Sequence, residues 1–203
     1  MKFSVSRIGA SLLAMFLVAC SSAPTRTIDQ HQAETAQLQR ELRLQSQDHW
    51  RLSGRVAVSA NGDGGSGALL WTERGGQTAF ELRAPVTGRS WRLTVGEQGA
   101  LIEGLESGPL SDSDPQRLLR ESVGWEIPLA ALRFWVRGAR APGPAVIEFN
   151  AEGWPTRIEQ QGWVVEYREW MDTEQGRMPK RVFASRGDQR VRLAAGRWQF
   201  EHG

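Results

Sequence analysis

The sequence predicts a mainly β protein with some α-helix, in which a curved antiparallel sheet forms a half-open, unclosed barrel. Two observations support this prediction. Short segments that alternate apolar and polar residues recur on both sides of residues 114–138, with glycine-rich turns between them. Residues 114–138 themselves repeat their apolar positions with a helical period. Because a sheet of about ten strands curls, short helices on its concave face would enclose an apolar cavity.

The predicted sheet begins at Trp50. From there Leu52, Val56 and Val58 alternate with residues that suit an exposed face, a pattern typical of a half-buried strand. The glycine-rich stretch 61–67 is predicted to be a turn. Four further strands are predicted before the helices, at 68–74, 80–84, 91–95 and 100–105.

Two short helices follow these strands. Asp114 and Pro115 form an N-cap with proline in the first turn. Pro128 begins a second apolar helix, and Gly138 is its predicted stop. The rest of the chain returns to the alternating pattern, with strands predicted at 146–150, 156–161, 164–170, 179–185 and 191–195.

Residues 1–19 have the features of a lipoprotein signal peptide. Lys2 and Arg7 come before an apolar run that ends at Ala19 and is too short to span a bilayer. Small residues just before Cys20, the only cysteine of the chain, are what a lipoprotein signal peptidase accepts. We therefore predict that the thiol of Cys20 carries a lipid; an ordinary signal peptide beside an unrelated cysteine is the simpler alternative.

The mature chain is predicted to be anchored to a membrane without crossing it. About 180 residues remain, enough for one domain with a core. Residues 20–49 are predicted to form the lipidated cysteine, a tether and a helix, and residues 50–203 the β domain. The helix carries Leu38 and Leu42 but is otherwise polar, so we expect it to pack loosely at the domain edge. Serine after the cysteine favours the outer membrane.

No motif for catalysis, metal binding or nucleic-acid binding stands out. The three histidines lack the spacing of a zinc site, and the glycine-rich turn lacks the lysine of a phosphate-binding loop. Ser66 is not in a nucleophile elbow, which makes a lipid-modifying hydrolase the least favoured function. Asp112 and Asp114 are best explained as turn and cap residues. The formal charge of +2 includes Lys2 and Arg7, so the mature chain is near neutral and does not predict nucleic-acid binding.

Nine tryptophans stand against a single tyrosine. Most of them are expected to fill the core, but a concave body lined with aromatic and aliphatic side chains also suits an acyl chain. A structural envelope lipoprotein that holds no ligand is the alternative. The predicted cavity residues are Val56, Val58, Trp71, Phe80, Leu82, Trp91, Leu93, Leu119, Leu129, Leu132, Trp135, Val165 and Tyr167.

Several short motifs, taken in order, resemble the LolB family of outer-membrane lipoprotein receptors. The resemblance covers residues 50–198 and includes the lipoprotein signal. Its motifs are Trp50, Gly54-Arg55, Trp71, Pro85-Val86, Gly124, Pro128-Leu129, Leu132, Trp135-Val136, Gly138, Gln161-Gly162-Trp163, Val165, Tyr167, Pro179 and Trp198. No single motif is specific, but their order is.

The resemblance implies both a fold and an activity. The fold would be a curved antiparallel sheet closed by helices around an apolar cavity. The protein, a monomer without cofactor or metal, would take lipid-modified lipoproteins from the periplasmic carrier LolA and insert them into the outer membrane from its periplasmic face. The resemblance places Val86 at the apolar tip of a loop that touches outer-membrane phospholipid. The family commonly has Pro-Leu-Gly where this chain has Pro85-Val86-Thr87, and Trp91 is a second candidate for the insertion role.

Overall fold

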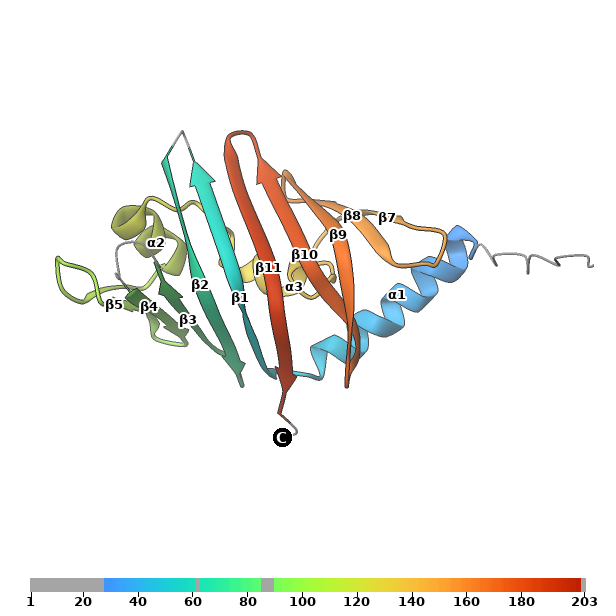
Figure 1. The fold of residues 1–203 in the computed structure, drawn as a ribbon, viewed down its shortest axis with the longest axis horizontal. Helices are drawn as coiled ribbons and strands as arrows, with labels where there is room; N and C mark the ends of the chain where they lie inside the picture. Colours follow the sequence, from blue (N-terminus) through green and yellow to red (C-terminus); the bar gives the residue numbers. More distant parts are fainter. Residues whose placement is uncertain (1–27, 61–62, 85–89, 202–203) are drawn as a thin grey trace, which may run out of the picture.

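A single antiparallel sheet dominates the structure, a computed structural model that describes residues 28–60, 63–84 and 90–201. Its eleven strands follow the order β6-β5-β4-β3-β2-β1-β11-β10-β9-β8-β7. Because the order ends in two edge strands, β6 and β7, the sheet does not close into a barrel. Figure 1 shows it curving around α2 and α3. The predicted fold class, an unclosed antiparallel sheet with short helices, is confirmed.

All ten predicted strands are present, and the structure adds one. The extra strand, β6, has only three residues and no alternating pattern, which is why the sequence did not predict it. The elements in chain order are α1 (Gln30–Gln45), β1 (His49–Ala60), β2 (Asp63–Arg74), β3 (Gln77–Arg83), β4 (Ser90–Gly96), β5 (Gly99–Glu103), β6 (Leu110–Asp112), α2 (Pro115–Val123), α3 (Leu129–Trp135), β7 (Val146–Phe149), β8 (Pro155–Gln160), β9 (Trp163–Thr173), β10 (Gly176–Arg186) and β11 (Gln189–Phe200).

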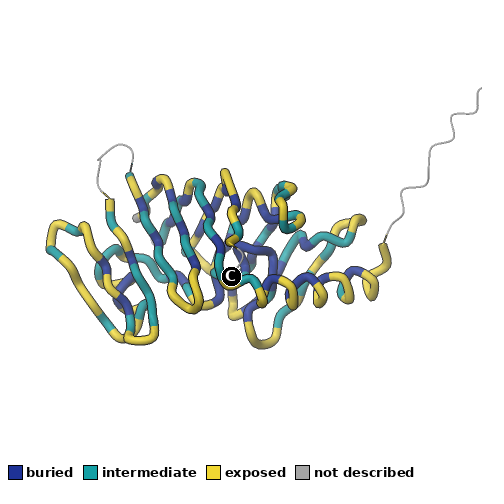
Figure 2. Tube along the Cα trace, turned by 90° about the horizontal axis from the view of Figure 1, so that it is seen from below, coloured by how far each residue is buried: buried dark blue, intermediate teal, exposed yellow. Residues whose placement is uncertain are grey.

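The two central strands, β1 and β11, come from opposite ends of the sheet-forming sequence. They pair antiparallel from Trp50 opposite Phe200 onward, with a bulge at Gly54. A side chain at Gly54 would collide with the backbone carbonyl of Ala194, so only glycine lets the strands approach here. Figure 2 shows the consequence of the pleat, since buried and less buried residues alternate along the strands.

The two short helices begin and end where the sequence predicts. The carboxylate of Asp114 accepts hydrogen bonds from the backbone N–H groups of Gln116 (2.9 Å) and Arg117 (3.2 Å), which caps α2. Gly124 ends α2 in the left-handed conformation. Gly138 also has a positive φ, 71°, just after α3. The interpretation of Asp114 as a cap residue is therefore confirmed.

Helix α1 packs through its polar face, contrary to the expectation of a loose contact. Leu38 and Leu42 are 54% and 66% exposed, whereas Gln37, Arg40 and Glu41 are buried. Two large apolar residues of the helix therefore face solvent, and the face toward the domain combines the three polar residues with the buried Ala33 and Leu44. Hydropathy alone predicts the opposite, because it does not register hydrogen bonds to distant segments.

The loop after α3 supplies the partners of this polar face. The carbonyl of Gly138 accepts hydrogen bonds from Gln37 Nε2 at 2.9 Å and from Arg40 Nη1 at 2.7 Å. Arg140 forms an ion pair with Glu41 at 2.7 Å, and its backbone N–H donates to the same carboxylate. Helix α1 is therefore fixed to the end of α3 by directional bonds, which cost more to break when buried.

A second buried arginine strengthens this junction. Arg137 Nη1 donates to the carbonyls of Leu44 at 2.7 Å and Gln47 at 3.1 Å, which lie at and just beyond the end of α1. Burial lowers the pKa of Arg137 to about 10, and burial likewise lowers the pKa of Arg40 to about 10. Both side chains therefore remain charged at neutral pH, with backbone carbonyls as their main partners.

Every described helix and strand lies within residues 30–200, and the hydrophobic core spans from Leu44 to Trp198. A chain that begins at residue 21 therefore keeps the complete folded body. Within the described residues, no helix combines the length and apolar content that crossing a bilayer requires.

Candidate functional site: an apolar cavity under two helices

The strands on one side of the sheet build an apolar floor. In β2, β3 and β4 the inward-facing residues form two rows that follow the pairing register. One row joins Trp71, Phe80 and Leu93, and the next joins Leu69 to Leu82 and on to Trp91. The central strands β1 and β11 extend this floor with the cross-strand pairs Val56–Leu193 and Val58–Val191.

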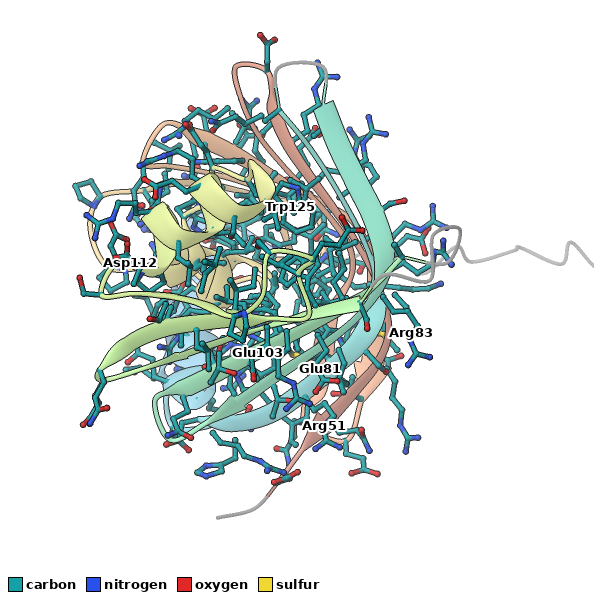
Figure 3. The ribbon with its side chains drawn as sticks, turned by 90° about the vertical axis from the view of Figure 1, so that its left-hand side faces the viewer. Arg51, Glu81, Arg83, Glu103, Asp112 and Trp125 are labelled. Carbon is teal, nitrogen blue, oxygen red and sulfur yellow. The ribbon has the colours of Figure 1, made fainter. Side chains whose placement is uncertain are left out.

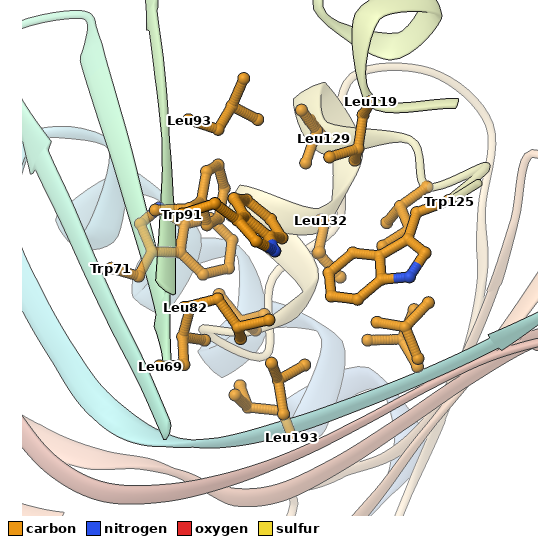
Figure 4. Close-up of a pocket in the computed structure, with 16 residues that line it drawn as sticks. Leu69, Trp71, Leu82, Trp91, Leu93, Leu119, Trp125, Leu129, Leu132 and Leu193 are labelled. Atoms are coloured by element: carbon orange, nitrogen blue, oxygen red, sulfur yellow. The ribbon is translucent and has the colours of Figure 1, made fainter. Parts of the chain in front are cut away.

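The two helices and the segment between them form the roof. α2 contributes Leu119, α3 contributes Leu129 and Leu132, and the connecting segment 124–128 contributes Trp125 and Ile127. In Figure 4, Leu119, Trp125, Leu129 and Leu132 lie opposite the side chains of the floor. The full lining comprises sixteen residues, all apolar: Val56, Val58, Leu69, Trp71, Phe80, Leu82, Trp91, Leu93, Leu119, Trp125, Ile127, Leu129, Leu132, Val136, Val191 and Leu193.

The enclosed space is small in this conformation, about 40 Å³. A water molecule needs about 10–15 Å³ measured in this way, so the cavity would hold only a few water-sized groups. An acyl chain of about fifteen methylenes is several times larger. The lining is wholly apolar, and it would have to rearrange before the cavity could hold such a chain.

Ten of the thirteen predicted cavity residues come together around this space. They are Val56, Val58, Trp71, Phe80, Leu82, Trp91, Leu93, Leu119, Leu129 and Leu132. Trp135, Val165 and Tyr167 are not among the lining residues; they lie in the other half of the core, at 0%, 0% and 5% exposure. The sequence correctly predicts that these three point inward, but it does not reveal that the second half of the sheet is filled.

Hydrogen bonds explain why that second half is filled. Gln160 Oε1 accepts from the indole N–H of Trp135 and from the backbone N–H of Ala141, both at 2.9 Å, and its amide N–H donates to the Ala141 carbonyl at 2.7 Å. The hydroxyl of Tyr167 donates to the Trp135 carbonyl at 2.9 Å, and burial raises the pKa of that hydroxyl. These bonds hold α3 and its following loop against β8 and β9.

Six lining residues were not predicted: Leu69, Trp125, Ile127, Val136, Val191 and Leu193. For Leu69, Val191 and Leu193 the signal was available, because each alternates with exposed neighbours on a predicted strand. Trp125 and Ile127 lie in the irregular segment between the helices, where no periodicity indicates which side chain faces inward.

Two tryptophans separate the cavity from an open groove. Trp91 and Trp125 are in edge-to-face contact, with ring centroids 5.4 Å apart, and both line the cavity and the groove. The groove has a volume of about 770 Å³. It is bordered by the end of β1, the start of β2, the segment after β5 and the end of α2. The contact of the two rings therefore closes the apolar cavity on this side.

These two tryptophans lack the indole hydrogen bonds that Trp71, Trp135 and Trp198 have. The indole N–H groups of Trp71 and Trp198 donate to Glu73 and to the Pro179 carbonyl, at 2.9 and 3.1 Å. Among the described residues, neither Trp91 nor Trp125 has a hydrogen-bond partner for its indole. Ring contacts and packing hold the two rings together. Next to Trp125, the carboxylate of Glu126 also accepts a hydrogen bond from the side-chain amide of Gln189 on β11.

Two predicted functional residues lie outside the described part of the chain. These are Cys20, the predicted lipid attachment site, and Val86, the predicted insertion residue. The described residues that flank Val86 are Ala84 and Ser90, and Ala84 lines the open groove together with Trp91. In the ranges that the structure describes, no three His, Cys, Asp or Glu side chains gather in a way that could hold a metal ion.

Comparison with known protein families agrees with this architecture. A family model described as outer membrane lipoprotein LolB matches residues 48–198. The chain belongs to the LolB family. The family predicted from the sequence motifs is therefore confirmed.

Several relatives carry the description outer-membrane lipoprotein LolB. A protein of Xanthomonas axonopodis pv. citri is 37% identical over 172 residues, which is 82% of this chain and 79% of the relative. Relatives from Alkalilimnicola ehrlichii and Xanthomonas oryzae pv. oryzae are 36% and 34% identical, and each match covers 93% of this chain and 94% of the relative. The similarity to these LolB proteins thus extends over nearly the whole chain.

Among solved structures, the fold resembles a LolA superfamily protein from Nitrosomonas europaea. The TM-score is 0.51 at 10% sequence identity, and the match covers 77% of this chain and 88% of that protein. At this identity the likeness concerns the fold alone. A sheet covered by short helices, as in this chain, is therefore also present in that solved structure.

Proposed function

We propose that this protein is an outer-membrane lipoprotein receptor that accepts lipoproteins from a soluble LolA-like carrier and delivers them to the membrane. The observation that carries the proposal is the wholly apolar cavity between the sheet and two helices in a chain of the LolB family. The cavity would receive acyl chains of the cargo. No step of this activity makes or breaks a covalent bond, so the proposal needs no catalytic residue and no cofactor.

The energetics of acyl chains explain why a cavity is required. Exposing one chain of about fifteen methylenes to water costs about 12 kcal/mol, so a cargo with three such chains would need about 36 kcal/mol for free release. A barrier of that size corresponds to a rate of about 10⁻¹⁴ per second. Carrier and receptor must therefore meet with their cavities facing each other, and a preference of ~1.4 kcal/mol for the receptor already gives a tenfold bias.

The proposal includes the processing of the N-terminus. Residues 1–19 would be removed as a signal peptide, and lipid on Cys20 would hold the protein, as a monomer, to the periplasmic face of the outer membrane. Residues 20–49 would provide the tether and α1, and residues 50–203 the lipoprotein-binding domain. Replacing Cys20 with serine should shift the protein from the membrane fraction to the soluble fraction or leave it unprocessed.

A transfer assay tests the receptor function directly. The chain from residue 21 onward is mixed with a periplasmic carrier already loaded with a lipoprotein, and the protein that holds the cargo is identified. Movement of the cargo to this chain supports the proposal. If the cargo stays on the carrier while circular dichroism indicates a folded receptor, the proposal is wrong and a ligand-free scaffold becomes the better explanation.

The delivery step is proposed to depend on Val86. Val86→Glu should leave transfer from the carrier intact but abolish incorporation of the cargo into phospholipid vesicles, because a charged side chain does not enter the bilayer. Val146, which is 62% exposed on the edge strand β7, offers a matched control. Val146→Glu should leave both steps unchanged, and equal loss in both variants would contradict the role of Val86.

A further inference from the structure

The outer, convex face of the sheet carries a set of arginines that no part of the receptor function uses. Arg55, Arg83, Arg190, Arg192 and Arg197 are all exposed on β1, β3 and β11. Their neighbours along each strand, such as Val56 and Leu193, point into the core, so these five arginines share the opposite face. In Figure 3, Arg83 lies outside the sheet while Trp125 lies inside it.

These five arginines lack carboxylate partners within the described residues. Other arginines of the sheet, in contrast, are paired: Arg92 with Glu81 at 2.6 Å, Arg168 with Glu166 at 2.8 Å and Arg181 with Glu169 at 3.0 Å. The centre of the convex face therefore carries uncompensated positive charge in a chain that is near neutral overall.

The pairing register arranges this charge regularly. One row across four strands reads Arg83, Ala68, Arg55, Ala194, so an arginine without a carboxylate partner alternates with alanine from β3 to β11. The next residue of the row, Arg181 on β10, is paired with Glu169. Alternate strands lie about 9–10 Å apart, and the alanines between them leave the guanidinium groups unobstructed. The result is a broad basic surface, which suits a planar array of anionic groups. Toward β4, Arg83 borders an open groove whose lining includes Glu81 and Glu103, so the unpaired positive charge is concentrated on β1 and β11.

We propose that this convex basic face binds a bilayer containing anionic phospholipids. The inference rests on the proposed anchor at Cys20, because residues 20–27 span at most about 28 Å when fully extended. The folded body would therefore always be within reach of the bilayer, and a weak surface attraction would be enough to orient it. An acidic region of the carrier fits less well, since a carrier on the convex face could not reach the cavity on the other side of the sheet.

This orientation has a direct consequence for the receptor. With the convex face on the lipid, the cavity with its helices points away from the bilayer and is open to a soluble carrier. Arg83 is separated from residues 85–89 by Ala84 alone, so the basic face begins beside the segment that holds Val86.

Vesicle binding by the chain from residue 21 onward tests the proposal. Vesicles of phosphatidylcholine alone are compared with vesicles in which a quarter of the lipid is phosphatidylglycerol, by sedimentation at low and at high salt. The protein should bind the anionic vesicles and lose binding as salt rises. The variant R55Q/R190Q/R192Q should bind about a hundredfold more weakly, since each arginine near an anionic surface is worth about fivefold.

Two control variants separate the patch from net charge. R55K/R190K/R192K keeps the charge and should retain binding, whereas R92Q/R157Q/R168Q removes the same charge from ion-paired positions and should lose much less. Equal binding by R55Q/R190Q/R192Q and the parent, or equal binding of the parent to neutral vesicles, would overturn the proposal. Loss of cargo transfer by R55Q/R190Q/R192Q in vesicle-free solution would also overturn it, because the face would then be a binding site for the carrier.

Failure of the proposed receptor function would look different. In that case the parent chain would accept no cargo in the vesicle-free assay, whatever its affinity for anionic lipid.

Discussion

The inner face of the sheet is filled in two different ways. Under α2 and the start of α3, the side chains of β1–β4 and β11 that line the cavity are apolar and leave a space of about 40 Å³. Behind them, the buried carboxylate of Glu73 accepts a hydrogen bond from the indole N–H of Trp71. Under the end of α3, the side chains of β8 and β9 reach the helix and its following loop through Gln160 and Tyr167. Apolar contacts dominate the first half, where Gln189 of β11 also donates one hydrogen bond to Glu126 in the segment between the helices. The second half is held by several buried hydrogen bonds with fixed geometry.

This difference indicates which half can open. Apolar surfaces can separate and accept another apolar surface with little loss, because the hydrophobic contribution depends on the area removed from water. A buried hydrogen bond has no such substitute, since an acyl chain offers no donor or acceptor. The hydrogen-bonded half, together with the junction of α1 and the loop after α3, therefore provides a fixed frame for the half that is proposed to bind acyl chains.

The largest expected effect comes from breaking the fixed half. Gln160→Leu leaves the Trp135 N–H and the backbone groups of Ala141 without their partner, so the free energy of unfolding should fall by about 3–5 kcal/mol. Urea denaturation measures it. In the cavity half, Leu129→Ala should cost only about 2 kcal/mol, because Leu129 is partly exposed and borders free space. A reversed order of these two costs would contradict the comparison.

Filling the space should separate binding from stability. Val56→Phe adds a ring on the cavity floor, so binding of a hydrophobic fluorescent probe should weaken at least about tenfold while the free energy of unfolding changes by less than about 1 kcal/mol. Val165→Phe makes the same change in the filled half, where it should cost about 1–3 kcal/mol. That control variant should bind the probe like the parent. Equal loss of probe binding in both variants would mean that the two halves do not differ.

A smaller effect is expected at the tryptophan contact that closes the cavity. Trp125→Ala removes the edge-to-face contact with Trp91, so probe association and dissociation should each accelerate about two- to tenfold. Stopped-flow fluorescence measures both rates. Trp154, whose ring centroid lies 5.2 Å from that of Trp170 at the other end of the molecule, provides the control. Unchanged rates in Trp125→Ala, or the same acceleration in Trp154→Ala, would exclude the proposed closure.

The smallest expected effect is on the pH dependence of stability, through Glu41 at the junction of α1 and the loop after α3. Burial acts to raise the pKa of Glu41, but hydrogen bonds from Arg140 and Gln37 outweigh it and hold the pKa below its usual value. A carboxylate with a lowered pKa stabilises the fold above its unfolded pKa of about 4.3 and loses that contribution as the pH falls further. The melting temperature of Glu41→Gln should therefore fall less steeply between pH 5 and 3 than that of the parent. Parallel curves would show that Glu41 does not contribute.

The sequence predicts the inward faces of strands well and the interior of irregular segments poorly. Alternation identifies Phe80, Leu82 and Leu93 as cavity residues, because the pleat fixes where each residue points. It cannot distinguish them from Val165, which also points inward but belongs to the filled half. That distinction depends on Gln160, a polar residue whose partners lie 19 to 25 positions away in the sequence.

Helix α1 is the second region whose contacts the sequence does not predict. Its sequence offers Leu38 and Leu42 on one face, yet both are exposed. The helix contacts the domain through Leu44 together with the polar residues Gln37 and Arg40. Such contacts depend on backbone carbonyls about one hundred residues away, which local patterns do not encode.

The order of strands in the sheet also governs when the protein can fold. β1 and β11 are neighbours at its centre, although some 140 residues separate Trp50 from Val191. Contacts between distant segments form slowly, because a long loop must close before they contribute. Until β11 is available, β1 and β10 each have an open edge. The strands before the helices therefore cannot join the strands after them. The centre of the sheet therefore cannot form before β11 has been synthesised, which lengthens the time that the earlier strands spend unfolded.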